Sequence, residues 1–143
     1  MAIMVLVAQQ LVKEYRSRSL AVRALNGVDL AVAPGEFLAV MGPSGSGKST
    51  LLHLLGGLDQ PTSGAVVVRG QSLFDMDDNA LTRFRRREIG FVFQFFNLLP
   101  TLSAEENILL PVAIGGEVNG EVRHRFRQLV RLLGLGGRLG HRP

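Results

Sequence analysis

The segment from Gly42 to Thr50 restricts the fold of this chain more than any other. Its residues, Gly-Pro-Ser-Gly-Ser-Gly-Lys-Ser-Thr, fit the pattern G-x-x-x-x-G-K-[ST] of a phosphate-binding loop. An apolar run from Glu36 to Met41 precedes the loop, and a second run from Leu51 to Leu55 follows it. The first run predicts a buried strand, and the second predicts a helix. This order of strand, loop and helix predicts an α/β fold and disfavours a simple Gly/Ser-rich turn.

Every residue type in this loop suits contact with a polyphosphate. Glycines let the backbone take positive φ so that consecutive N–H groups form an anion nest, and the following helix adds its positive dipole end. We expect Lys48 to contact the outer phosphates as a candidate catalytic charge, Ser49 to bind Mg²⁺, and Thr50 to reach an inner phosphate. The predicted nucleotide-binding residues of the loop are Gly42, Pro43, Ser44, Gly45, Ser46, Gly47, Lys48, Ser49 and Thr50.

Composition places the chain among globular proteins that have no disulfide or thiolate-metal chemistry. It has 143 residues, of which 46% are hydrophobic and 20% charged, and it has no cysteine. Its three histidines make no metal-ligand pattern, so any metal should arrive with the nucleotide. No apolar run approaches the ~18 residues of a membrane span, and the start lacks a signal-peptide pattern, which predicts a cytoplasmic location.

The net charge of +4 could indicate an anionic partner such as nucleic acid, but the distribution of the charges along the chain argues against one. The densest basic cluster runs from Arg83 to Arg87, is followed by Glu88, and has several acidic residues upstream. Its one aromatic residue, Phe84, does not make the stacking surface of a nucleic-acid site. We expect a solvated helix face and no nucleic-acid partner, with a protein-docking surface as the alternative.

The rest of the sequence predicts short strands and helices. Strands are expected from Ile3 to Ala8, Val28 to Val32, Ala65 to Arg69 and Ile89 to Phe93. Helices are expected from about Asn79 to Arg87, from a capping box of Ser103 and Glu106 to about Pro111, and from about Gly120 to Leu133. The tail from Gly134 to Pro143 predicts a loop.

Two longer blocks of sequence, which extend beyond the phosphate-binding pattern itself, help to indicate a family. The run STLLHLLGGLDQPTSG spans Ser49 to Gly64, and the run IGFVFQFFNLLPTLSAEENILLP spans Ile89 to Pro111. With the loop itself, these blocks resemble the Walker A and Q-loop regions of the nucleotide-binding subunit of ATP-binding-cassette transporters. Within that family they are most similar to the lipoprotein-release and macrolide-export group. The resemblance implies an ATPase that uses ATP and Mg²⁺ on the inner face of the cell membrane.

The resemblance also implies roles for residues outside the loop. Gln94 is similar to the Q-loop glutamine, a catalytic residue that would contact Mg²⁺ and orient the attacking water. Tyr15, the only tyrosine, lies where the family has an aromatic residue that stacks on adenine. On the residues alone, Gln94 would equally suit a polar residue that caps a strand. The alternative for Tyr15 is a tyrosine on the flank of a strand. A transmembrane permease subunit would dock near Gln94 to Leu99, and a second nucleotide-binding subunit would complete a homodimer of the full-length protein.

The resemblance covers the whole chain as part of a nucleotide-binding domain of the phosphate-loop NTPase type, with an antiparallel β part near the N-terminus. Residues from about 1 to 95 would form the core with Walker A and the Q-loop, and residues from about 96 to 143 would begin the helical subdomain. The 143 residues end before the family's signature motif, and they contain no Walker B Asp-Glu pair or switch histidine. We therefore expect ATP binding without turnover by this chain alone, and no general base within it.

Two other functions stay open at this stage. The chain would also suit a non-hydrolysing nucleotide-binding fragment that acts as an interaction or regulatory module. A small-molecule kinase or a GTPase is less favoured, because the sequence has no guanine-reading Asn-Lys-x-Asp pattern and no lid arginine motif. The transported substrate is not readable from the sequence, since that choice belongs to membrane partners.

Overall fold

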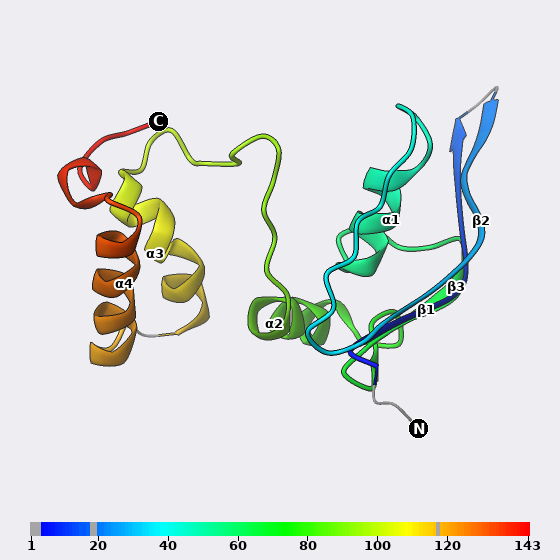
Figure 1. Cartoon of the computed structure of the whole chain (residues 1–143), viewed down its shortest axis with the longest axis horizontal. Coiled ribbons are helices and arrows are strands. Elements are labelled where there is room, and N and C mark those ends of the chain that lie inside the picture. The colour runs from blue at the N-terminus through cyan, green and yellow to red at the C-terminus, as the bar shows by residue number, and fades with distance from the viewer. Residues whose placement is uncertain (1–3, 18–19, 117) are drawn as a thin grey trace. The chain divides into compact units, whose positions relative to one another are not determined.

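A computed structural model describes residues 4–17, 20–116 and 118–143, and Figure 1 shows their elements in chain order. The chain divides into two compact units, Met1–Ile89 and Gly90–Pro143. The first unit holds β1 (Leu6–Ser17), β2 (Leu20–Val32), α1 (Lys48–Leu55), β3 (Ser63–Val68), β4 (Gln71–Ser72) and α2 (Asp78–Glu88). The second holds α3 (Ala104–Gly115), α4 (Gly120–Leu132) and the short 3-10 helix η1 (Gly136–Arg138). None of the helices in these described residues has the length and apolar character needed to cross a membrane.

The first unit is built on a four-stranded sheet in the order β2-β1-β3-β4. Each pair of neighbouring strands is antiparallel, which confirms the α/β class and the antiparallel part near the N-terminus. The strand predicted at residues 65–69 is confirmed as β3. The strands predicted at residues 3–8 and 28–32 are the open end of a much longer hairpin of β1 and β2, and Ile3 lies outside the described residues.

An irregularity in β1 explains why the sequence pattern understated this hairpin. Ala8 and Leu11 are both buried although they lie three residues apart, whereas the side chains of a regular strand alternate between its two faces. The pairing register with β2 shifts between these two residues, and Gln10 has a φ of 46°. The irregularity changes which residues face the core. The alternation of buried and exposed side chains that indicates a strand is therefore interrupted after Ala8, and the sequence pattern predicts a strand that is too short.

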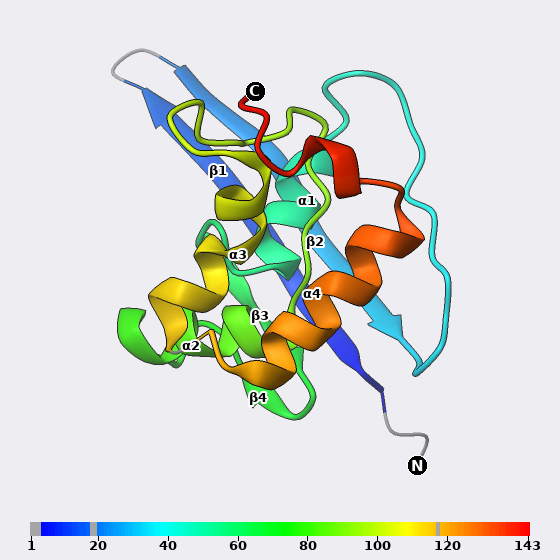
Figure 2. The same ribbon diagram turned by 90° about the vertical axis from the view of Figure 1, so that its left-hand side faces the viewer.

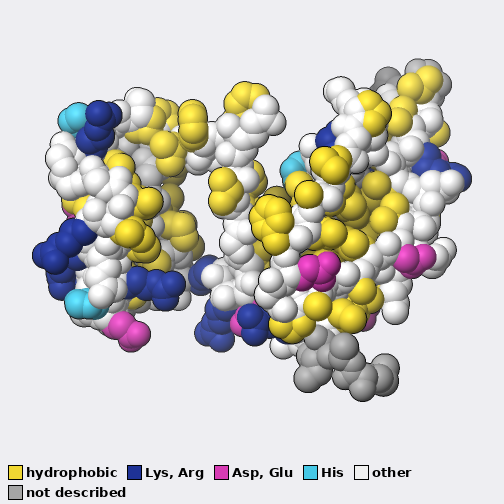
Figure 3. All heavy atoms as spheres, viewed as in Figure 1, with side chains coloured by type: hydrophobic (Ala, Val, Ile, Leu, Met, Phe, Trp, Pro, Cys, Tyr) yellow, Lys and Arg dark blue, Asp and Glu magenta, His cyan; other side chains and the backbone are white. Residues whose placement is uncertain are grey.

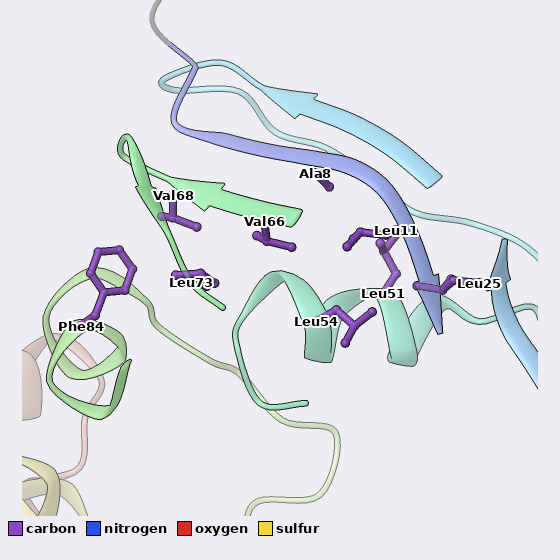
Figure 4. Close-up of a cluster of buried hydrophobic side chains, with 9 residues drawn as sticks. All are labelled: Ala8, Leu11, Leu25, Leu51, Leu54, Val66, Val68, Leu73 and Phe84. Carbon is purple, nitrogen blue, oxygen red and sulfur yellow. The ribbon is translucent and has the colours of Figure 1, made fainter. Parts of the chain in front are cut away.

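Helix α1 packs on the sheet through its two buried leucines. Figure 4 shows Leu51 and Leu54 of this helix pointing toward side chains from the sheet. The cluster that they join extends from the hairpin to α2 and consists of Ala8, Leu11, Leu25, Leu51, Leu54, Val66, Val68, Leu73 and Phe84. Because α1 begins directly after the phosphate-binding loop, this packing sets the position of the loop relative to the sheet.

Two predicted strands are wrong, at residues 36–41 and 89–93. Both segments are apolar, yet much of each is exposed, with Phe37 95% and Met41 88% exposed. Hydrophobic side chains are accordingly visible on the surface of the first unit (Figure 3). A strand needs a neighbour to receive and donate its backbone hydrogen bonds. Among the described residues no strand pairs with either segment. The apolar pattern therefore indicates side chains that favour burial, but it does not show that a pairing strand is present.

Both α-helices of the second unit begin at a capped N-terminus. Ser103 Oγ accepts a hydrogen bond from the Glu106 N–H at 3.3 Å, and the Glu106 carboxylate accepts from the Ser103 N–H at 2.7 Å. This arrangement confirms the predicted capping box. The predicted end of α3 is wrong, because the helix continues past Pro111 to Gly115. A proline removes one N–H donor and often bends a helix, but it does not oblige the helix to end.

The C-terminal segment is more ordered than the predicted loop. After η1 it returns to the start of α3 (Figure 2). The carbonyls of Leu139 and His141 accept hydrogen bonds from the N–H groups of Glu105 and Ala104, at 3.0 and 2.8 Å. These donors belong to the first turn of α3, where an N–H has no partner within its own helix. The segment therefore adds to the capping of α3.

Leu54 offers a test of the packing between α1 and the sheet. Its side chain is fully buried, so Leu54→Ala should lower the free energy of unfolding by about 2–5 kcal/mol through lost apolar burial and a cavity. Leu52→Ala is the matched control, because Leu52 lies on the same helix but is 55% exposed, and its truncation should cost less than about 0.5 kcal/mol. Urea unfolding followed by circular dichroism measures both. Equal losses would contradict the packing described above.

Candidate functional site

The predicted phosphate-binding loop lies between residues 36–41 and the start of α1. Gly45 and Gly47 have φ values of 79° and 89°, in the left-handed region that favours glycine. Gly47 directly precedes the first helical residue, and its carbonyl accepts the first helical hydrogen bond from the Leu51 N–H at 2.8 Å. The loop therefore enters α1 as predicted, although the residues before it form no strand.

The N-terminus of α1 differs from those of the other α-helices. Helix α2 is capped by Asp77, which accepts from the Ala80 N–H at 2.7 Å, and α3 and α4 are capped by Ser103 and Asn119. No described side chain caps α1, and the residue at its cap position is Gly47. The first N–H groups of a helix have no partner within the helix, and the helix dipole makes this end positive. Helix α1 therefore presents an anion-binding end.

The side chain of Lys48 folds back over the loop. Its Nζ donates to the carbonyl of Gly42 at 2.9 Å and to that of Pro43 at 2.7 Å, and it lies 3.4 Å from Ser46 Oγ. These contacts hold an ammonium, which has three donors and no acceptor, beside the loop backbone. Backbone N–H groups and a flexible cation together form a donor set that fits a polyphosphate.

Gly47 also lies against the hairpin. A Cβ atom built on it would be 2.5 Å from the carbonyl oxygen of Ala24 and 3.1 Å from Leu25 Cδ2. No such contact exists at Gly45, where a Cβ atom would have no neighbour among the described atoms within 4 Å. The loop is thus packed tightly on β2 at its exit and is open at Gly45.

Replacing each of these glycines by alanine should separate backbone strain from close packing. Both variants place a side chain at a positive φ, which costs roughly 1–2 kcal/mol. Gly47→Ala should lose more than Gly45→Ala, because its Cβ would also push α1 away from Ala24. The measurement is the free energy of unfolding in urea for the two variants. If Gly47→Ala loses no more free energy of unfolding than Gly45→Ala, the structure around Ala24 adjusts to the added Cβ at little cost and the prediction is wrong.

The two predicted metal ligands belong to different units. Ser49 is exposed in the first turn of α1, and Thr50 beside it is half-buried. Gln94 is exposed in the second unit, in the irregular segment between α2 and α3. Within residues 4–17, 20–116 and 118–143 no group of three acidic or histidine side chains would hold a metal by itself. A shared role of Ser49 and Gln94 at Mg²⁺ therefore stays a prediction.

Tyr15 is held by Lys13 and Asp59, two residues that no sequence motif indicated. Its hydroxyl donates to Asp59 Oδ2 at 3.0 Å, and Lys13 Nζ lies 4.8 Å from the centroid of its ring. Lys13 Nζ also donates to Asp59 Oδ1 at 2.7 Å and to the Gln60 carbonyl at 2.6 Å. The spacing of Lys13 and Tyr15 on one strand signals a shared face. Asp59 lies 44 residues beyond Tyr15, and no sequence pattern pairs the two.

The contacts of Asp59 favour its ionised form. The hydrogen bond from the Lys13 ammonium lowers the pKa of the Asp59 carboxyl below its ordinary value. Partial burial opposes this shift, while the Tyr15 hydroxyl and the Gln60 N–H also lower the pKa. Asp59 is therefore a carboxylate at neutral pH, the form that accepts the hydrogen bond from Lys13 Nζ.

The stabilising effect of Asp59 should depend on pH in a defined direction. Because its pKa is lower in the folded than in the unfolded chain, its contribution is complete above the unfolded value of about 4 and is lost as the pH falls through the folded value. Asp59→Asn should thus lower the free energy of unfolding by up to about 1 kcal/mol at pH 7. The difference between wild type and variant, measured by urea unfolding from pH 7 to 3, should shrink toward acid. A constant difference would contradict this assignment.

A glycine-rich loop, an uncapped helix N-terminus and a lysine folded over the loop define a phosphate-binding-loop protein of the α/β class. Comparison with known proteins makes this class specific. The family profile described as ABC transporter matches residues 25–143, which include the whole loop. The chain therefore belongs to the ABC transporter family.

Named relatives share about half of their residues with this chain. The lipoprotein-releasing system ATP-binding protein LolD of Maricaulis maris is 52% identical over 119 residues, which cover 83% of this chain and 52% of LolD. The macrolide export ATP-binding/permease protein MacB of Marinobacter nauticus is 47% identical over 135 residues, covering 94% of this chain and 21% of MacB. The chain thus spans about half the length of this LolD and a fifth of this MacB.

A solved structure has the same fold. The dimeric post-hydrolysis state of the ATP-binding cassette MJ0796, bound to ADP and Pi, is similar with a TM-score of 0.87 and 41% sequence identity. The similarity covers 96% of this chain and 61% of that one. The arrangement of sheet and helices described above is therefore that of part of an ATP-binding cassette.

Proposed function

We propose that this chain is part of the ATP-binding subunit of an ABC transporter that exports a substrate or releases lipoproteins. The observation that carries the proposal is the uncapped N-terminus of α1 with Lys48 folded over the preceding loop. The names of LolD and MacB support the class of transport, and the ADP and Pi bound by MJ0796 support the ligand.

The loop residues supply the phosphate contacts in this proposal. Backbone N–H groups from Gly42 to Thr50 bind the phosphate oxygens, and Lys48 leaves its loop carbonyls to neutralise the outer phosphates. Ser49 would offer its hydroxyl oxygen to Mg²⁺, Gln94 is a further candidate oxygen ligand, and Tyr15 would stack on the adenine base. Bound Mg²⁺ would spread the charge that develops on the transferred phosphoryl group.

We place the docking site for a permease subunit at residues 94–99. This segment carries exposed apolar side chains, among them Phe95 and Phe96, which are 78% and 84% exposed. Exposed apolar clusters of this kind fit a protein partner. A second nucleotide-binding subunit is the other proposed partner, supported by the dimeric state of MJ0796. Docking to a permease would place the protein on the cytoplasmic side, peripheral to the cell membrane.

We assign ATP hydrolysis to the full-length protein. The matched residues of this chain cover 52% of the LolD relative and 61% of the MJ0796 cassette. In this proposal residues from about 1 to 95 form the ATP-binding core and residues from about 96 to 143 begin the helical subdomain. Lys48 and Gln94 are the catalytic candidates, by charge and by orientation of water, and no residue here is assigned as the general base.

Lys48→Ala should weaken Mg²⁺-ATP binding by about tenfold or more. A charge-assisted hydrogen bond contributes roughly 1.5–3 kcal/mol, and alanine removes both the charge and the donors. Isothermal titration calorimetry on the purified chain measures the affinity.

Arg86→Ala is the matched control for this experiment. It removes one positive charge from an exposed position on α2, outside the loop, and should leave the affinity unchanged. An unfolding midpoint close to wild type would show that Lys48→Ala keeps its fold despite losing its two carbonyl contacts. Unchanged ATP affinity in Lys48→Ala would overturn the proposed role of the loop.

A further inference from the structure

Hydrogen bonds to Asp59 connect Tyr15, the proposed adenine-stacking residue, to the segment that follows α1. Asp59 comes four residues after Leu55, the last residue of α1. Its carboxylate accepts hydrogen bonds from the Tyr15 hydroxyl and from the Lys13 ammonium. Lys13 is well buried for a lysine, with 12% of its side chain exposed. Such a lysine needs a partner, and Asp59 and the Gln60 carbonyl provide it.

The segment carrying Asp59 is itself fixed to β1. The Thr62 N–H donates to the carbonyl of Val12 at 2.8 Å, and Thr62 Oγ1 accepts from the Glu14 N–H at 2.9 Å. These bonds lie on either side of Lys13 in the strand. Asp59 is therefore held at a defined distance from β1, and it can act as a fixed anchor for the Tyr15 hydroxyl.

Two sides of the Tyr15 ring are thereby engaged. The hydroxyl is bonded to Asp59, and the Lys13 ammonium lies over one face, where it meets the negative potential of the ring. Tyr15 as a residue nevertheless stays 44% exposed, which leaves part of its surface accessible to a ligand. An aromatic ring held at its edge and on one face loses little further freedom when a base stacks on its accessible part.

We propose that Lys13 and Asp59 are positioning residues for nucleotide binding, which hold the Tyr15 ring ready to stack on the base. This inference rests on the proposed function, in which Tyr15 contacts adenine. It adds that ATP affinity depends on two residues that need not touch the nucleotide. Ordering one flexible side chain corresponds to about a 2- to 13-fold change in affinity. Loss of the stacking ring itself corresponds to about a 5- to 150-fold change.

The test compares binding of Mg²⁺-ATP with binding of Mg²⁺-tripolyphosphate, which has no base. In wild type, ATP should bind more tightly, and Tyr15→Ala should remove most of this preference. Asp59→Ala and Tyr15→Phe should each lower the preference by about 2- to 13-fold with tripolyphosphate affinity unchanged. Because both variants break the same contact, the double variant should lose no more than the larger single loss.

Asp29→Ala is the matched control. The Asp29 carboxylate also bonds to β1, accepting from the Gln10 N–H at 2.8 Å, but Asp29 has no part in the Tyr15 contacts. This variant should leave the preference for ATP unchanged. If Asp59→Ala does not fold, Asp59→Asn replaces it in the experiment, because asparagine keeps the size of the side chain. This variant should also lower the preference for ATP over tripolyphosphate.

The outcomes separate this inference from the proposed function. If Tyr15→Ala abolishes the preference while the Asp59 variants keep it, the positioning role is overturned and the proposed function stands. Parallel loss of ATP and tripolyphosphate binding in the Asp59 variants would assign them a structural role and also overturn the inference. If wild type binds neither ligand, both proposals fail together.

Discussion

The packing of Leu51 and Leu54 against the sheet is the contact on which the candidate site depends. Helix α1 is only eight residues long, and helices of that length are not stable by themselves in water. Its N-terminus has no side-chain cap among the described residues, and its entry requires positive φ at Gly45 and Gly47. These features are unfavourable for the isolated segment. Burial of the two leucines in the core offsets them and keeps an anion-binding end open.

Helix α1 is held at both ends as well as along its buried face. Gly47 packs against the Ala24 carbonyl of β2 at its start, and the segment after its end is bonded to β1 through Asp59 and Thr62. The hairpin of β1 and β2 therefore supports the phosphate-binding loop and Tyr15 together. A shared support of this kind sets the relative position of the loop and Tyr15 in advance, which would favour a ligand that contacts both, as the proposed function requires.

Local signals in the sequence predicted much of the fold. The loop, the helix after it, the helix at residues 79–87 and the capping box of Ser103 and Glu106 were found, because each depends on residues close together in the chain. The strands at residues 36–41 and 89–93 were not formed, since an apolar run shows a preference for burial but not the presence of a pairing strand. The irregularity at Gln10 likewise hid the length of β1, because it changes the face on which apolar side chains lie.

The sequence by itself determined the chemical class of the site. The glycines, Lys48 and the two hydroxyl residues that follow it specify phosphate binding wherever the loop precedes a helix. The tertiary structure alone decided that Lys13, Tyr15 and Asp59 form one cluster. Lys13 and Asp59 are 46 residues apart, and they meet because α1 packs on the sheet and the chain after it returns to β1, with which β3 then pairs. Contacts between distant segments depend on the path of the whole chain, and no local pattern of residues contains that path.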